Sequence, residues 1–269
     1  MKHLFIFILM ALATTAHAQT SKLRALDTEY AAASWKAVGR IDFGRGGQCS
    51  GTLITKDLVL TAAHCLYMPD NTLWPISDIQ FHAGLRNGKA VVTRRASKIA
   101  AHEKYIPEGD ARFENIPYDI ALIQLAEPIS TFEVAPFHLF QEAVGPGPVS
   151  VVSYGQGRSN VQSRQKECQM MDRERDVMLF DCDVTYGSSG APVFTHKNGR
   201  GQIMSVISNM AMLDGEKRSF GMVLPGRVNE LKRQLRMQVA PPTAKARRVT
   251  LKNQNNRSGL SAKFLRPGG

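Results

Sequence analysis

The chain has 269 residues, and its 34 lysines and arginines outnumber its 23 aspartates and glutamates, which gives a formal net charge of +11. No apolar run approaches the roughly 20 residues that a membrane-spanning helix needs, so the sequence argues against a membrane-embedded protein. The basic C-terminal segment has almost no aromatic residues for stacking on bases, which argues against sequence-specific nucleic-acid binding. The chain is long enough to bury a sizeable core.

The first residues have the pattern of a signal peptide. A lysine precedes an apolar run at residues 4–13, and the small residues Ala16 and Ala18 mark a cleavage site. We therefore expect residues 1–18 to be removed and the protein to be secreted, either into a periplasm or outside the cell. Residues 19–37 are helix-compatible or irregular, and we expect them to form a leader or pro-segment, or simply an N-terminal strap.

Short runs with β-branched residues dominate the next part of the chain, and glycine, proline, asparagine and aspartate separate them. Many short strands with such punctuation are typical of a sandwich or a barrel, so we expect an all-β fold. The clearest runs are residues 51–55, 58–61, 120–125, 149–154 and 202–208.

A helix and a basic tail are expected near the C-terminus. The helix should span about residues 227–236, where Val228, Leu231 and Leu235 recur at helical spacing. Residues 240–269 contain basic but no acidic residues and have the low hydrophobicity of segments that do not fold. We expect this tail to be disordered, and its charge would suit attachment to an anionic surface.

The four cysteines lie in two local pairs along the chain. An even number of cysteines in a secreted protein favours two disulfides over a metal site, and neither Cys-x-x-Cys nor His-x-x-x-His spacing for zinc occurs. The sequence permits three pairings. The local grouping suggests Cys49 with Cys65 and Cys168 with Cys182, each link worth on the order of 3 kcal/mol.

Three short motifs supply a histidine, an acid and a serine in this order: TAAHC at 61–65, YDIAL at 118–122 and GSSGAP at 187–192. A serine hydroxyl is a poor nucleophile near neutral pH, so it needs an imidazole to accept its proton and a buried carboxylate to orient that imidazole. The order is that of chymotrypsin, whereas subtilisins and α/β-hydrolases use other orders. The motifs therefore favour a serine-nucleophile hydrolase.

With these motifs, the chain resembles the trypsin/chymotrypsin superfamily of serine endopeptidases, particularly its compact bacterial secreted members. The most specific matches are residues 49–54 (CSGTLI) and 60–65 (LTAAHC). The resemblance implies two six-stranded antiparallel β-barrels, followed by a C-terminal helix, with the active site in the cleft between the barrels. The expected bounds are 38–239 for the protease domain and about 38–130 and 145–225 for the barrels.

The resemblance also implies the roles of individual residues. His64 would be general base and then acid, Asp119 its orienting carboxylate and Ser189 the nucleophile. Ser188 is the competing serine, but the pattern Gly-x-Ser-Gly-x-Pro places the nucleophile at its third position. The backbone N–H groups of Gly187 and Ser189 would form the oxyanion hole. No cofactor or catalytic metal is implied, a structural Ca²⁺ on scattered loop carboxylates stays open, and the expected partners are protein or peptide substrates.

One departure from the trypsin pattern concerns maturation. In trypsin-like zymogens, an aspartate just before the nucleophile pairs with a newly freed N-terminus. Here that position is Ser188, and no Arg-Ile-Val-Gly-Gly activation site precedes the first strand. We therefore expect this chain not to mature through that ion pair.

Substrate preference is predicted from the residue six positions before the nucleophile, Asp183. A carboxylate at the floor of a partly dry pocket would favour a substrate arginine or lysine before the cut bond. Ser208 would line the pocket wall, and Gly221 would keep the pocket open. The alternative is a glutamate-specific branch, in which Thr185 would line the pocket; residues 202–210 lack the histidine that usually accompanies glutamate binding.

A hypothesis from another class is a non-catalytic cationic binding protein on the protease fold. Such proteins usually lose the histidine or the serine, whereas this chain keeps all three candidate catalytic residues. The other histidines of the mature chain have no motif around them and are interpreted as surface or structural residues: His82, His102, His138 and His196.

Overall fold

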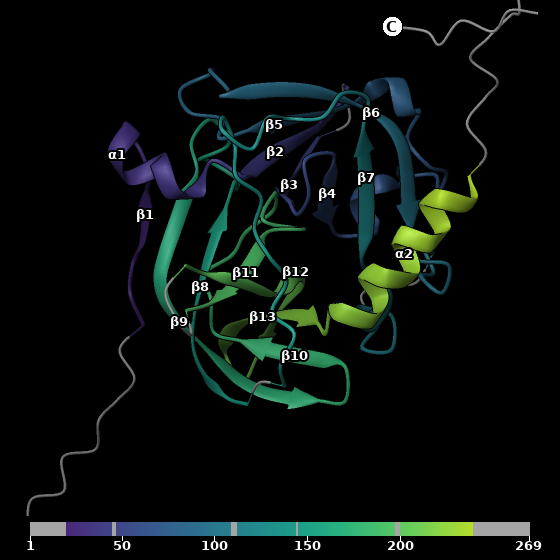
Figure 1. The fold of residues 1–269 in the computed structure, drawn as a ribbon. Helices are drawn as coiled ribbons and strands as arrows, with labels where there is room; N and C mark the ends of the chain where they lie inside the picture. The colour runs from purple at the N-terminus through teal and green to yellow at the C-terminus, as the bar shows by residue number, and fades with distance from the viewer. Residues whose placement is uncertain (1–19, 45–46, 109–111, 144, 197–199, 239–269) are drawn as a thin grey trace, which may run out of the picture. The chain divides into compact units, whose positions relative to one another are not determined.

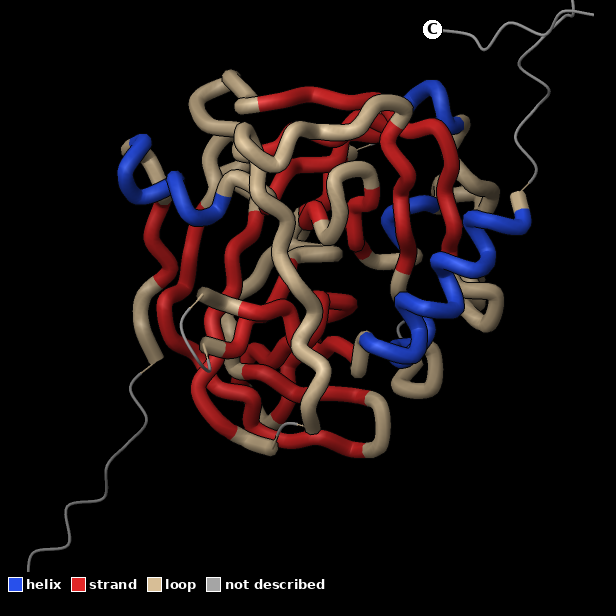
Figure 2. The backbone as a smooth tube through the Cα atoms, viewed as in Figure 1, coloured by secondary structure: helices blue, strands red, loops and turns tan. Residues whose placement is uncertain are grey.

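The computed structural model describes residues 20–44, 47–108, 112–143, 145–196 and 200–238 (Figure 1). The predicted signal peptide and the predicted basic tail, 1–18 and 240–269, lie outside these residues. Strands make up most of the described chain (Figure 2). Within it, none of the helices combines the length and the hydropathy needed to cross a membrane.

The first barrel closes from six antiparallel strands in the order β2-β3-β4-β7-β6-β5. Alternate side chains point into it, as β5 shows, where Ile79, Phe81 and Ala83 are buried and the residues between them are partly exposed. The strands are β2 (Val38–Phe43), β3 (Gln48–Leu53), β4 (Leu58–Thr61), β5 (Ile79–Ala83), β6 (Val92–Ala101) and β7 (Ala121–Leu125).

The second barrel also closes from six antiparallel strands, in the order β8-β9-β10-β13-β12-β11, because β11 and β9 both pair with β8. A further short strand, β1, pairs with β9. The strands are β1 (Leu23–Ala25), β8 (Gly147–Ser153), β9 (Ser163–Glu174), β10 (Val177–Phe180), β11 (Pro192–Thr195), β12 (Gln202–Leu213) and β13 (Glu216–Met222). The predicted fold of two six-stranded barrels is confirmed.

The N-terminal segment packs as a strap. After β1 it forms α1 (Glu29–Ala32) and the 3₁₀-helix η1 (Ala33–Trp35). Trp35 is buried, with its ring centroid 5.8 Å from that of Phe137 and 5.1 Å from that of Phe194 in β11. This aromatic cluster belongs to a core that contains residues of both barrels. Residues 20–37 therefore pack against the barrels in the structure, and their removal as a leader or pro-segment stays a prediction.

The C-terminal helix α2 (Pro225–Met237) packs against β6 and β7 of the first barrel (Figure 1). The residues predicted to recur at helical spacing, Val228, Leu231 and Leu235, are its buried residues. Short 3₁₀-helices complete the described elements: η2 (His64–Leu66), η3 (Ile76–Asp78) and η4 (Ile116–Tyr118).

Two disulfides link neighbouring elements. Cys49 in β3 is bonded to Cys65 in η2, and Cys168 in β9 is bonded to Cys182, which follows β10. The first disulfide lies beside His64 and therefore ties η2 to the wall of the first barrel. Of the three possible pairings, the structure has the one that the local grouping suggested.

Candidate active site

Strand pairing brings His64 and Asp119 together. Thr61 at the end of β4 pairs with Ala121 at the start of β7, so the two chains leave the sheet side by side. His64 lies three residues after Thr61, in η2, and Asp119 lies two residues before Ala121, just after η4. The two motifs, far apart in the sequence, therefore meet at one end of the first barrel.

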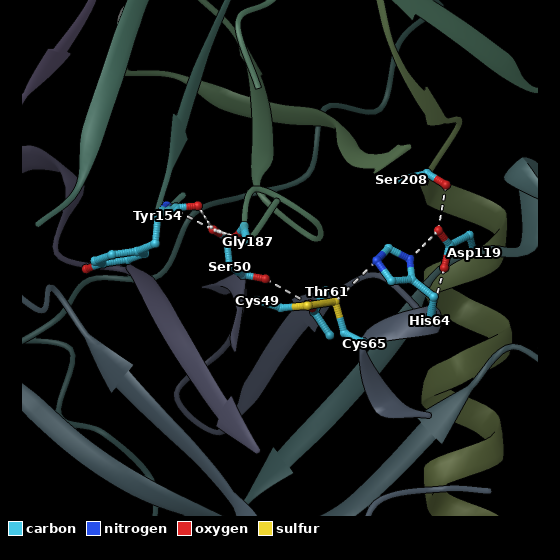
Figure 3. The surroundings of a disulfide bond; sticks show 9 residues. All are labelled: Cys49, Ser50, Thr61, His64, Cys65, Asp119, Tyr154, Gly187 and Ser208. Carbon is cyan, nitrogen blue, oxygen red and sulfur yellow. Dashed lines mark hydrogen bonds and ion pairs between the residues drawn. A yellow bond between two sulfur atoms is a disulfide. The ribbon is translucent and has the colours of Figure 1, made fainter. Parts of the chain in front are cut away.

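Asp119 holds His64 through two atoms (Figure 3). Its Oδ2 lies 2.8 Å from Nδ1 of His64, and its Oδ1 accepts a 2.8 Å hydrogen bond from the backbone N–H of His64. The hydroxyl of Ser208 in β12 also donates to Oδ2, at 2.5 Å. Because an ionised carboxylate only accepts, Nδ1 of His64 carries the proton and Nε2 is the basic nitrogen.

His64 and Asp119 shift each other's pKa. Burial alone would lower the pKa of His64, but the negative charge of Asp119 and its hydrogen bond outweigh burial and raise that pKa above its ordinary value. Burial alone would raise the pKa of Asp119, which is 4% exposed; the charge and hydrogen bonds of His64, with the bond from Ser208, hold it below its ordinary value. A protonated His64 is therefore stabilised by an ionised Asp119.

Ser189 lines the same cleft as His64 and Asp119, and this cleft has a volume of about 310 Å³. Within the described residues, Ser189 Oγ and His64 Nε2 form no hydrogen bond, a contact that often tightens only when substrate binds. Ser188 is fully buried, and its hydroxyl binds Ser153, Arg158 and the backbone N–H of Thr185. Of the two serines, only Ser189 is therefore accessible from the cleft.

The turn around Ser189 presents two backbone donors. The N–H groups of Ser188, Gly190 and Ala191 donate to backbone carbonyls, whereas those of Gly187 and Ser189 have no acceptor among the described residues. Gly187 has a φ of +88°, a conformation that suits glycine. Gly190 has no room for a side chain, since a Cβ there would lie 2.2 Å from Oγ1 of Thr61.

The residues predicted to bind substrate are not all in the cleft. Thr185 and Ser208 line it. Asp183 does not: its carboxylate forms an ion pair with Lys217, and its N–H donates to Oε1 of Gln165 at 2.7 Å. In this structure, then, Asp183 does not line the cleft, and Lys217 is the partner of its charge.

Gly221 does not line the cleft either. It lies in β13 between Met178 of β10 and Ile207 of β12, where a Cβ would come within 2.3 Å of Oγ of Ser205. Its role here is close packing of neighbouring strands rather than an open pocket.

The wall near Thr185 and Ser208 includes side chains that the sequence did not single out. Most are apolar or uncharged, and the cleft is also bordered by one arginine. These residues are Tyr105, Arg112, Asn115, Ile116, Val184, Tyr186, Ile207, Asn209 and Met210. The bond from Ser208 to Asp119 was also missed, because a hydroxyl in a strand gives no local signal of a partner 89 residues away.

Potential metal ligands in the described chain gather at two places, and each contains a disulfide: Cys49, His64 and Cys65, and Cys168, Asp181 and Cys182. A metal prefers a thiolate, which a disulfide sulfur cannot offer. Neither group is therefore a metal site.

The other histidines lie outside the cleft. His102 is buried, and its Nε2 lies 2.8 Å from a Glu230 carboxylate oxygen in α2. His82 pairs with Thr93 and Asp42, and the hydroxyl of Ser150 lies 2.7 Å from Nε2 of His196. The contacts of these three histidines agree with their interpretation as surface or structural residues.

Comparison with known protein families gives a match to the model described as Trypsin over residues 27–220. Trypsin Blo t 3 of Blomia tropicalis is 30% identical over 154 residues, which are 54% of this chain and 52% of that protein. Snake venom serine protease catroxase-1 of Crotalus atrox is 33% identical over 95 residues, 35% of this chain and 32% of that protein. The chain thus spans about half of the Blomia tropicalis protein's length and about a third of the venom protease's.

Solved structures are similar in fold at low sequence identity. A Glu endopeptidase in complex with MPD has a TM-score of 0.64 and 18% identity, covering 82% of this chain and 98% of its own. The protease Anisep from Arthrobacter nicotinovorans has a TM-score of 0.61 and 19% identity, covering 79% and 98%. These neighbours share the double-barrel architecture with this chain.

Proposed function

Because this chain belongs to the trypsin family, we propose that it is a secreted serine endopeptidase that cuts peptide bonds through His64, Asp119 and Ser189. The observation that carries the proposal is the cleft in which an Asp119-bound His64 and an accessible Ser189 lie together. The two backbone N–H groups without acceptors among the described residues, on Gly187 and Ser189, add a place for a developing oxyanion.

In the proposed reaction, Ser189 Oγ attacks the carbonyl carbon of the scissile bond while Nε2 of His64 takes the hydroxyl proton. The imidazolium formed is stabilised by Asp119, which stays ionised. The carbonyl oxygen becomes an oxyanion that the N–H groups of Gly187 and Ser189 bind; losing one such donor typically costs about 10²- to 10³-fold in rate.

Collapse of the tetrahedral intermediate passes the proton from His64 to the leaving amine, and an acyl group remains on Ser189. A water molecule then attacks the ester, with His64 again as the base, and the acid product leaves. Every proton transfer uses Nε2, which Asp119 leaves available by holding the proton on Nδ1.

Three candidate substrate preferences differ in their support. A preference for arginine or lysine requires Asp183 to exchange Lys217 for the substrate cation. A preference for an uncharged side chain is supported by Val184, Ile207 and Met210, which border the cleft beside Ser189. We favour the second, because the described wall beside Ser189 offers no carboxylate apart from Asp119. A glutamate preference, the third possibility, has no histidine on the described wall apart from His64, the proposed base.

The test is hydrolysis of peptides that differ only in the residue before the cut, by the chain beginning at Gln19 and by its Ser189→Ala variant. We expect cleavage that disappears in the variant and is fastest after an uncharged residue. Cleavage fastest after arginine or lysine would restore Asp183 as the pocket floor. Equal activity of both proteins would refute the catalytic serine, and biological activity without any hydrolysis would favour the binding protein.

A further inference from the structure

The oxyanion turn needs a brace, because its first donor belongs to a glycine. A glycine adopts positive and negative φ with similar ease, so the peptide units beside Gly187 could rotate and point their carbonyls into the cleft. The N–H of Gly187 belongs to the peptide unit whose carbonyl is on Tyr186, and that oxygen accepts a 2.8 Å bond from the N–H of Gln156. The next peptide unit carries the carbonyl of Gly187.

Gly187 precedes β11 of the second barrel, but its carbonyl is bound by a residue of the first barrel. Ser50, which follows Cys49 in β3, donates its hydroxyl to Gly187 O at 2.8 Å. The same hydroxyl accepts a 2.9 Å bond from the N–H of Tyr154, two residues before Gln156. One buried side chain thus joins the turn of Gly187 to the loop that holds Tyr186 (Figure 3).

The backbone of Ser50 makes further contacts on the same path. Its N–H donates to Ser189 O at 2.9 Å, and its carbonyl accepts a 2.9 Å bond from the hydroxyl of Thr61, three residues before His64. The disulfide from Cys49 to Cys65 runs beside this link (Figure 3). Ser50 therefore contacts the oxyanion turn on one side and the strand that leads to His64 on the other.

We propose that Ser50 is a positioning residue for the oxyanion hole: its hydroxyl fixes the peptide units around Gly187 so that the N–H groups of Gly187 and Ser189 face the cleft. This inference rests on the proposed function. Ser50 does not line the cleft, so it acts through the turn and not on the substrate. Its removal should slow the step in which negative charge develops and should leave substrate binding largely unchanged.

The test compares Ser50→Ala with a matched control in the same strand, Thr52→Val. Thr52 is equally buried, and its hydroxyl has no hydrogen-bond partner in the described structure. We expect Ser50→Ala to lower kcat about 10- to 100-fold, less than the loss of a donor itself, with KM within about twofold of the parent. Thr52→Val should leave both constants unchanged.

A second readout separates positioning from general stability. A peptide aldehyde whose adduct carries an oxyanion should lose affinity for Ser50→Ala in the same proportion as kcat falls. Ser50→Thr, which keeps the hydroxyl, should recover most of the kcat. The proposal would be overturned if folded Ser50→Ala kept the kcat of the parent, or if only its KM rose.

Amide hydrogen exchange tests the contact itself, even where the variant does not fold. In the parent protein, the Tyr154 amide should exchange slowly because it donates to Ser50, while the Gly187 and Ser189 amides exchange faster. Rapid exchange at Tyr154 would overturn the inference whatever the activity. If the parent does not hydrolyse peptides in a Ser189-dependent way, the proposed function fails, and the exchange pattern still decides the structural contact.

Discussion

The two barrels contribute to the candidate site in different ways. In the first barrel, the register of β4 against β7 places His64 and Asp119, so the positions of both side chains follow from strand pairing. In the second barrel, Asp183 and Ser189 lie on the segment between β10 and β11, where side-chain directions depend on local turns and partners. Motif spacing therefore predicts the first arrangement well and the second only in part.

The largest effect is expected from a substitution that disrupts the pairing of His64 with Asp119 in the first barrel. Asp119→Asn should lower kcat about 10⁴-fold, because an amide can donate to Nδ1 of His64 and so favours the wrong tautomer. The measurement is kcat for a peptide amide substrate at the optimal pH. Substrate affinity should change little, because Asp119 faces His64 and Ser208. A loss of less than tenfold would show that Asp119 does not orient the base.

The next prediction concerns Arg158, which contacts the second-barrel turn at Ser188. Its guanidinium donates to Ser153 O at 2.8 Å and to the hydroxyl of Ser188 at 3.2 Å. Arg158→Met would remove these bonds, although the Ser188 hydroxyl keeps the N–H of Thr185 as a donor; a buried acceptor that loses its donor typically costs about 1 to 3 kcal/mol. We expect a lower thermal midpoint and a kcat reduced about tenfold or more.

A companion experiment to Arg158→Met extends the N-terminus, to test whether a free N-terminus is needed for activity. Because Arg158 supplies a cation beside Ser188, a few extra residues before Gln19 should leave kcat unchanged within about twofold. Loss of activity on extension would show that a free N-terminus is needed after all, and would contradict the expected independence from a zymogen ion pair.

An effect of at most similar size is expected for Ser208→Ala, which removes one donor to Asp119 but keeps its carboxylate. A bond to a charged group is worth about 1.5 to 3 kcal/mol, which sets an upper limit because His64 still binds Asp119, so kcat should fall by about 10- to 100-fold at most. The pH profile should also change. Nε2 must be unprotonated to act as a base, and the Asp119 charge raises the pKa of His64, so activity is lost as pH falls through that raised pKa.

The bond from Ser208 helps to keep Asp119 ionised, so its removal should raise the pKa of Asp119 toward the ordinary range. The profile of kcat/KM against pH measures both groups. An acidic limb below the pKa of an ordinary histidine in the parent would contradict the raised pKa of His64.

The smallest effect is expected for Asp183→Ser. The ion pair with Lys217 is half exposed, and such pairs contribute about 0 to 1 kcal/mol, so stability should hardly change. The preference among peptides should be unchanged within about twofold, since Asp183 does not line the cleft. A selective loss of cleavage after arginine or lysine of about 100-fold would show instead that Asp183 reaches the substrate. Lys217→Gln is the matched control for loss of the ion pair alone.

Local signals in the sequence, namely short β-branched runs, turn residues and helical spacing, predicted an all-β fold and the final helix. The two six-stranded barrels were predicted only from the resemblance that the motifs carry. The sequence placed His64 beside Asp119 only through the order and resemblance of the motifs.

The role of Asp183 in substrate binding stays a prediction; its ion pair with Lys217 could not be predicted, because Lys217 is 34 residues away on β13. Ser50 was missed as well, because the partners of the Ser50 hydroxyl, Tyr154 and Gly187, lie more than 100 residues further along the chain.

The central claim is that His64 activates Ser189, and a serine-directed fluorophosphonate tests it most directly. The chain from Gln19 is treated with the reagent beside its His64→Ala and Ser188→Ala variants, and the labelled peptide is located by mass spectrometry. We predict one adduct, on Ser189, that persists in Ser188→Ala and disappears in His64→Ala. An adduct on Ser188, or equal labelling without His64, would contradict the account.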